Sequence, residues 1–246
     1  MNSHPPIIIL DFDGVILPSI GARLALLKLL KDPRYNWNKS AVEKITTLDF
    51  IRRVESINSN KNIQVAYTIF SYFKEILPNF LDRIRFLVNL QRNFRKMEYS
   101  QAQFFPYVIP TLSELTKIAL IGICTNSEEK RINRWLSYYS ISSMISAFSS
   151  RKDRKRYGVK PDPRILLLVL WRIKKKANIR GGIDKNRVYF VGDNITDVLA
   201  AKNAGVKSIA VLSGHATRKE LEEINPDFII PTLQDIFSVP DLSNTI

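Results

Sequence analysis

The residues best suited to chemistry are two aspartates, Asp11 and Asp13, which stand two positions apart directly after the apolar run Ile7–Leu10. Four apolar residues, three of them β-branched, are typical of a strand buried on both faces of a parallel sheet. Gly14 follows at once and can turn the chain. Ligands of parallel α/β sheets bind at the carboxyl ends of the strands, so we expect the two carboxylates at a functional edge.

The ends of three further predicted strands supply more polar groups. Apolar runs predict these strands over residues 118–125, 144–148 and 187–191. The polar residues at or after these ends are, in chain order, Thr125, Asn126, Lys160, Asp193 and Asp197. Because strand ends of a parallel sheet share one edge, we expect these side chains to converge with the first two aspartates.

This set of side chains favours phosphate chemistry. Carboxylates without cysteine or histidine partners form a hard oxygen site, which suits Mg²⁺ and not Zn²⁺. A lysine and a hydroxyl beside such a site suit a phosphate group. A carboxylate nucleophile is a known route for phosphoryl transfer through an aspartyl-phosphate. The residues therefore predict a magnesium-dependent phosphoryl-transfer site.

Strands and helices alternate along most of the chain, which predicts a doubly wound parallel sheet. Two more strands are expected over 208–212 and 227–230. Helices are expected over 111–117, 128–138, 161–173, 197–204 and 220–223, with Gly205 ending the fourth of them.

Residues 18–105 differ from this pattern, because no segment in them alternates like a strand. Apolar positions with a period near 3.6 predict helices over 22–30, 41–50, 64–77 and 81–97. We therefore expect an α/β fold, with a Rossmann-like doubly wound core of residues 1–17 and 106–246. An inserted all-helical cap of residues 18–105 is expected to cover the strand ends.

Composition narrows the class of protein. No run of about 18 apolar residues is present, so we expect no transmembrane helix. Residues Met1–Pro6 lack the basic region of a signal peptide. The single cysteine, Cys124, excludes an intramolecular disulfide and fits a reducing compartment. These features predict a cytoplasmic protein without a membrane partner.

The formal net charge of +14 has two interpretations, a solvated basic surface or an anionic partner. The basic run Arg151–Arg156 precedes Lys160 and is expected near the site as a solvated loop. Steering of an anionic substrate and contact with nucleic acid are the alternatives. No recognisable nucleic-acid module is present, so a small-molecule phosphate ester is the expected partner. No pattern in the sequence indicates an oligomeric state.

The order of the motifs resembles the haloacid dehalogenase superfamily of aspartate-nucleophile phosphatases. The resemblance rests on D-F-D-G-V at 11–15, T-N at 125–126, V-K-P-D-P at 159–163, V-G-D-N-I-T-D at 191–197 and A-A-K-N-A-G at 200–205. It spans nearly the whole chain outside the helical insertion. The insertion directly after the first motif resembles the helical cap of the phosphoglycolate-phosphatase-like branch.

The resemblance implies roles for the four aspartates. Asp11 attacks phosphorus and becomes the aspartyl-phosphate. Asp13 protonates the leaving alcohol and then activates water, while its backbone carbonyl binds Mg²⁺. Asp193 completes the metal site with Asp11, and Asp197 acts on a metal-bound water or on Lys160.

The resemblance also implies a phosphate-binding set. Thr125, with Asn126 beside it, hydrogen-bonds the transferred phosphoryl oxygens. Lys160 neutralises the phosphate and orients Asp11. Gly14 lets the backbone turn so that amide groups reach the phosphate.

The second acid separates branches of the family. Dehalogenating members lack an acid at the position of Asp13, since a halide leaving group needs no proton. The sugar phosphomutase branch keeps both acids, but the segment after Gly14, V-I-L-P-S-I-G-A-R, shows no matching mutase cap signature. We therefore expect a phosphatase. A phosphomutase, or a protein that binds nucleic acid or processes its terminal phosphate, is the alternative.

Several of these residues also have a purely structural interpretation. Asp197 can be an acid at a helix N-terminus, Thr125 the end of a strand, and Lys160 one more solvated cation. Cys124 is expected in the core. His215 lies outside the motifs and is expected on the surface or in a loop.

Overall fold

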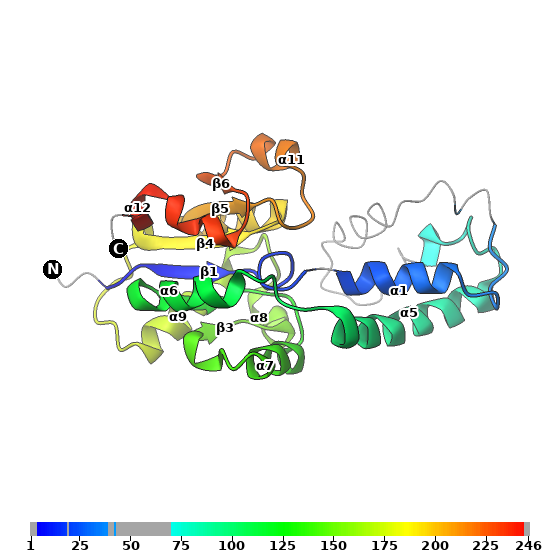
Figure 1. Ribbon diagram of the computed structural model, residues 1–246. Helices are drawn as coiled ribbons and strands as arrows, with labels where there is room; N and C mark the ends of the chain where they lie inside the picture. Colours follow the sequence, from blue (N-terminus) through cyan, green and yellow to red (C-terminus); the bar gives the residue numbers. More distant parts are fainter. Residues whose placement is uncertain (1–3, 19, 39–41, 43–69, 244–246) are drawn as a thin grey trace. The chain divides into compact units, whose positions relative to one another are not determined.

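The computed structural model describes residues 4–18, 20–38, 42 and 70–243 (Figure 1). The chain divides into two compact units. One consists of Met1–Pro18 together with Phe104–Ile246, and the other of Ser19–Gln103. Each unit has its own cluster of buried apolar side chains.

The first unit is built on a parallel sheet of six strands in the order β3-β2-β1-β4-β5-β6. The strands are β1 (Ile7–Leu10), β2 (Leu120–Ile123), β3 (Ala147–Phe148), β4 (Val188–Gly192), β5 (Lys207–Val211) and β6 (Phe228–Ile230). Every neighbouring pair is parallel, and β1 lies inside the sheet between β2 and β4 (Figure 1). The predicted doubly wound α/β fold is confirmed.

The central position of β1 follows from its sequence. All four of its side chains are fully buried, which only a strand covered on both faces allows. The backbone pairing also continues one step past the strand, since Asp11 N donates to Val191 O at 2.8 Å and Cys124 N donates to Leu10 O at 2.8 Å. The register therefore fixes Asp11 at the carboxyl edge, beside the ends of β2 and β4.

Helices cover the sheet and follow its strands. They are α6 (Val108–Ile118), α7 (Glu129–Tyr138), α8 (Arg154–Tyr157), α9 (Pro163–Lys176), α10 (Ile195–Ala204), α11 (Arg218–Glu223) and α12 (Pro240–Ser243). Short 3₁₀ turns are η1 (Ser142–Met144), η2 (Arg151–Asp153), η3 (Lys185–Arg187) and η4 (Leu233–Ser238). Val169 and Ile173 of α9 and Ala201 of α10 pack against Ile9 and Phe190 of the sheet, so these helices hold one face of the site's edge in place.

Local capping sets where α9 and α10 begin and end. Asp162 accepts a hydrogen bond from Arg164 N at 3.0 Å, and Pro163 occupies the first turn of α9. Asn194 and Asp197 form a reciprocal capping box at the start of α10. Gly205 ends α10 in the left-handed conformation, at φ 70°, as predicted.

The second unit contains α1 (Ile20–Leu30) and the 22-residue α5 (Phe80–Gln101), which pack together. Leu26 and Leu29 of α1 and Phe86 of α5 share one buried apolar cluster with Phe73. The predicted helices over 22–30 and 81–97 are confirmed. Apart from residue 42, the helix predicted over 41–50 lies outside the described residues. Of the helix predicted over 64–77 the structure describes residues 70–77, which are helical only at 70–72 and form a turn at 73–76. No helix of the described chain is long and apolar enough to cross a membrane.

Several predicted boundaries are wrong. The strand predicted over 144–148 is only β3, and Met144 belongs to η1. Helix α6 begins at Val108 and runs through Ile118, so β2 starts two residues later than expected. Thr111 does not cap this helix but lies inside it, where its backbone N–H donates to Tyr107 O at 3.0 Å. The segment after β3 was expected as a loop and instead forms η2 and α8.

The buried contact of β1 with α9 and α10 predicts a stability effect. Ile9→Ala removes a fully buried side chain from this core and should lower the free energy of unfolding by about 2–5 kcal/mol. Leu167→Ala on α9, at a side chain 36% exposed, should cost less than about 1 kcal/mol. Urea titration of both variants checks this, and equal losses would contradict the packing described.

Candidate active site

Lys160 lies between two buried carboxylates at the carboxyl edge of the sheet. Its Nζ is 2.9 Å from Asp11 Oδ2 and 2.5 Å from Asp197 Oδ1. The three residues are only 7%, 7% and 1% exposed in the order Lys160, Asp11, Asp197. Although burial opposes the charged form, the two carboxylates raise the pKa of Lys160 well above its usual value. The lysine is therefore a fixed positive charge and not a solvated surface cation.

Asp11, Asp193 and Asp197 form a cluster in which one carboxylate oxygen from each lies within 4.8 Å of the others. Burial raises the pKa of Asp11 well above its usual value, and the negative charges of Asp197 and Asp193 add to this effect against the opposing charge of Lys160. Burial and the charge of Asp197 likewise raise the pKa of Asp193 to about 7. Three acids thus share one buried cation, and their oxygen donors fit an additional hard cation such as Mg²⁺.

The loop after β5 also contacts Asp193. His215 N donates to Asp193 Oδ2 at 2.9 Å, and Ser213 Oγ donates to Gly14 O at 2.8 Å. A Cβ on Gly214 would lie 1.8 Å from Asp193 Oδ2, so only glycine fits there. Sequence reasoning missed this loop, although it follows a predicted strand and the argument from strand ends applies to it. His215 lies in a loop, as expected, and its backbone N–H brings that loop into contact with the site.

Gly14 is required by the close approach of the same aspartate. Its φ is +82°, and a Cβ would lie 2.2 Å from Asp193 Oδ2. The N–H of Gly14 donates to Leu17 O at 2.8 Å within the turn. A glycine is needed at this position because any larger residue would collide with Asp193. The backbone N–H of Gly14 already has a hydrogen-bond partner in the turn.

Thr125 and Asn126 follow β2 at the same edge. Thr125 is 2% exposed, and its Oγ1 accepts a hydrogen bond from Ser127 N at 3.1 Å, which leaves the hydroxyl proton for another acceptor. Asn126 Oδ1 is buried and has no hydrogen-bond partner among the described residues. Cys124 lies in the core as expected, and burial raises the pKa of its thiol to about 12.

Asp13 turns its carboxylate toward the first turn of α7 and is not part of the acid cluster. Arg131 Nη2 donates to its Oδ1 at 2.6 Å, and Arg131 Nη1 donates to its Oδ2 at 2.9 Å. Ser127 Oγ donates to the same Oδ2 at 2.9 Å. Burial favours a raised pKa for Asp13, but Arg131 and these hydrogen bonds hold it below its usual value. That the backbone carbonyl of Asp13 binds a metal stays a prediction.

Residues 8–211 match the family model described as haloacid dehalogenase-like hydrolase. The chain belongs to this family. One similar protein is the phosphoglycolate phosphatase of Photorhabdus laumondii, 32% identical over 138 residues, which are 56% of this chain and 55% of that protein. Another is pyrophosphatase PpaX of Bacillus velezensis, 27% identical over 155 residues, which are 62% of this chain and 67% of that protein.

Solved structures agree with this membership at the level of the fold. A haloacid dehalogenase-superfamily hydrolase of subfamily IA from Geobacter sulfurreducens aligns over 97% of this chain and 98% of its own, with a TM-score of 0.63 and 20% identity. The matches to the phosphoglycolate phosphatases span little more than half of those proteins' length.

The basic run of this haloacid dehalogenase-like hydrolase is partly neutralised by α7. Arg151 Nη1 is 3.2 Å from Glu128 Oε1, and Lys152 Nζ is 2.7 Å from Glu129 Oε2. Both acids stand at the start of the helix, where the dipole also favours them. The first two cations of the run are therefore ion-paired, which reduces the charge available to steer a substrate.

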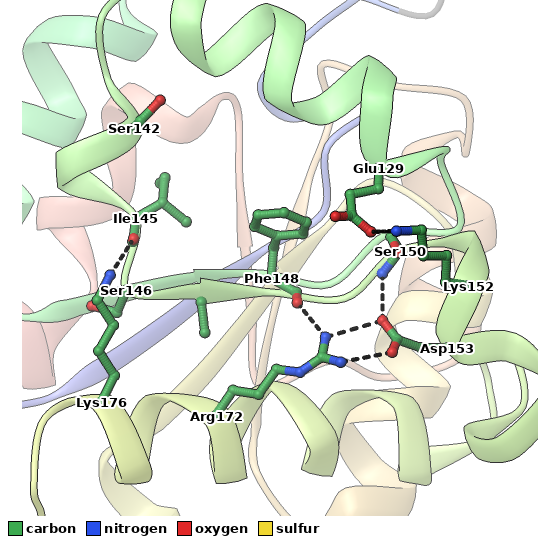
Figure 2. A pocket seen from close by; sticks show the side chains of 11 residues that line it. Glu129, Ser142, Ile145, Ser146, Phe148, Ser150, Lys152, Asp153, Arg172 and Lys176 are labelled. Carbon is green, nitrogen blue, oxygen red and sulfur yellow. Dashed lines mark hydrogen bonds and ion pairs between the residues drawn. The ribbon is translucent and has the colours of Figure 1, made fainter.

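A cavity of about 560 Å³ lies beside β3, and none of the predicted site residues line it (Figure 2). Its charged groups bind one another: Arg172 forms a two-point ion pair with Asp153 and donates to Phe148 O at 2.6 Å (Figure 2). Lys176 Nζ reaches Ile145 O at 3.4 Å. These contacts tie α9 to the segment around β3, so we assign the cavity a structural role.

The glycine contacts predict a sharp difference between two glycine variants. Gly14→Ala places a methyl group on Asp193 at a positive φ and should disrupt the acid cluster. Gly182→Ala, where a Cβ meets nothing within 4 Å, should behave as wild type. Mg²⁺ titration followed by thermal unfolding should show stabilisation of the wild type and Gly182→Ala only. Equal stabilisation of Gly14→Ala would contradict the assigned geometry.

The raised pKa of Asp193 predicts how stability depends on pH without metal. The folded pKa of about 7 lies above the ordinary value of about 3.9, so the folded state binds more protons between these values. In the presence of a chelator, which removes bound metal, the free energy of unfolding should therefore fall as pH rises from about 5 to about 8. Asp193→Asn should flatten this slope. Stability that rises over this range, or a slope unchanged by Asp193→Asn, would contradict the assignment.

Proposed function

We propose that this chain is a Mg²⁺-dependent phosphatase that hydrolyses a small-molecule phosphate monoester through an aspartyl-phosphate. The observation that carries the proposal is the buried Asp11 carboxylate, 2.9 Å from Lys160 and grouped with Asp193 and Asp197. A nucleophile, a fixed cation and oxygen ligands for a metal are the parts that phosphoryl transfer needs. Relatives named phosphoglycolate phosphatase and pyrophosphatase support the same chemistry.

In the first step, a carboxylate oxygen of Asp11 forms a bond to phosphorus as the bond from phosphorus to the ester oxygen breaks. Asp13 gives its proton to the departing oxygen, which leaves as the alcohol. Lys160 and the hydroxyl of Thr125 stabilise negative charge on the transferred phosphoryl oxygens. Asn126 borders the same space and contributes to binding the phosphoryl group.

In the second step, water attacks phosphorus and the bond from phosphorus to Asp11 breaks. Asp13, now a carboxylate, takes the proton of the attacking water and so returns to its starting form. Mg²⁺ would be held by the carboxylates of Asp11 and Asp193 and the backbone carbonyl of Asp13, and when bound it offsets phosphoryl charge. Asp197, 2.5 Å from Lys160, orients that lysine toward Asp11.

The helical unit Ser19–Gln103 is proposed to act as a cap. The expected cap of residues 18–105 has nearly the same limits. A cap that closes over such a site excludes bulk water and selects among phosphate esters by the shape and charge of their alcohols. Substrate selection in this proposal therefore depends on the cap as well as on core residues near Asp13.

A phosphatase assay with and without Mg²⁺ tests the proposal. Wild type should release inorganic phosphate from members of a phosphate monoester panel, a chelator should stop the release, and Asp11→Asn should lower kcat at least about 10³-fold. Glu114→Gln, at an exposed acid on α6, is the matched control and should keep full activity.

Three results would count against this reading. Full activity of Asp11→Asn excludes the nucleophile, and phosphate release that survives complete chelation excludes the metal. Conversion of a sugar phosphate to its isomer without net phosphate release would favour the phosphomutase alternative.

A further inference from the structure

Arg131 forms a two-point ion pair with the residue that the proposed mechanism needs as its general acid. Both oxygens of the Asp13 carboxylate accept from the guanidinium, at 2.6 Å and 2.9 Å. Ser127 Oγ accepts from Arg131 Nη1 at 2.5 Å and donates to Asp13 at 2.9 Å, so each of the three side chains is hydrogen-bonded to the other two. The Arg131 side chain is 13% exposed and the Asp13 side chain 32%.

The place of Arg131 in α7 does not favour a cation by itself. It stands in the first turn, near the positive end of the helix dipole, where acidic side chains are stabilised and basic ones are not. Its guanidinium carbon also lies 5.3 Å from the ring centroid of Phe12, within range of a cation–π contact. Contacts on the β1 loop, and not the helix, therefore hold this arginine beside the site.

The ion pair conflicts with proton transfer from Asp13. A carboxyl group that donates its proton to a leaving oxygen must turn that O–H toward the substrate. In this structure its two oxygens face three donor hydrogens of Arg131 and Ser127. The guanidinium must therefore exchange Asp13 for another acceptor before the acid can act.

We propose that Arg131 determines substrate specificity by binding a second oxyanion, carried by the leaving group, in exchange for Asp13. This inference rests on the proposed phosphatase function. The planar guanidinium fork binds carboxylate and phosphate oxygens with the same geometry that it uses for Asp13, so the exchange replaces like with like. A neutral alcohol offers no such acceptor, and Asp13 then stays paired.

The distances limit where the second anion is placed. The departing oxygen must contact Asp13 to receive its proton, and Arg131 is within 2.9 Å of both Asp13 oxygens. The second anion must therefore be a few bonds at most from the ester oxygen. A carboxylate on the adjacent carbon and a directly attached phosphate both satisfy this limit, and they share the chemistry of an oxyanion.

A matched pair of esters tests the inference. Phosphoglycolate and ethyl phosphate differ by a carboxylate in place of a methyl group, and inorganic pyrophosphate supplies the phosphate arm. Wild type should prefer one or both anionic substrates over ethyl phosphate. Arg131→Gln should lower that preference, measured as the ratio of kcat/KM values, about 10- to 100-fold. Arg131→Lys should recover part of it, because it keeps the charge without the fork.

Arg134→Gln is the matched control, since this arginine is exposed one turn along the same helix and should leave the ratio unchanged. If Arg131 only supports Asp13 structurally, its substitution lowers activity on both esters equally. An unchanged ratio in Arg131→Gln therefore overturns the inference and leaves the proposed function standing. No hydrolysis of any phosphate ester by wild type overturns both.

Binding to the inactive Asp11→Asn protein gives a second measurement that does not depend on turnover. Calorimetric titration should show that adding Arg131→Gln to this background weakens phosphoglycolate binding about 10-fold or more and leaves ethyl phosphate binding unchanged. Equal weakening of both ligands would contradict recognition of the second anion.

Discussion

The carboxylates of Asp11, Asp193 and Asp197 are buried together at the carboxyl edge of the sheet because the ammonium group of Lys160 offsets part of their charge. This ammonium group contacts Asp11 and Asp197, and the lysine is itself almost entirely buried. Removing one partner from a buried ion pair leaves an uncompensated charge, so the arrangement holds only as a set. The rest of the site depends on this set. Asp193 adds a further acid, and burial together with the charge of Asp197 raises its pKa to about 7. A divalent cation would fit among these carboxylates.

The second acid of the first motif belongs to a different electrostatic environment. Asp13 is only two residues from Asp11, and in an extended chain the two side chains would share one face. The strand ends at Leu10 and the chain turns through Gly14, so the two carboxylates have different neighbours. Its pKa is lowered by Arg131, whereas burial raises that of Asp11. Two neighbouring aspartates are thus separated into distinct proposed roles by their surroundings, one as nucleophile and one as acid and base.

The sequence predicts the sheet and the acid cluster because parallel strands bring their ends to one edge. That rule places Asp11 and Asp193 together, and the segments that follow β3 and β4 bring Lys160 and Asp197 to the same edge. It does not predict Arg131, since the partner of an arginine in the first turn of a helix is set by the tertiary position of that helix. Hydrophobic periodicity gives the wrong assignment at Ile118, which ends helix α6, because a short apolar run is compatible with both helix and strand. Both failures come from information that exists only once the elements are packed.

Trapping the covalent intermediate tests the central claim most directly. Enzyme mixed with a turned-over phosphate ester is quenched in acid over a series of short times, digested, and mapped by mass spectrometry. The account predicts one added phosphoryl group on the peptide that carries Asp11, lost in Asp11→Asn. A phosphoryl group on a different residue, or phosphate release without a labelled Asp11 at any quench time, would contradict it.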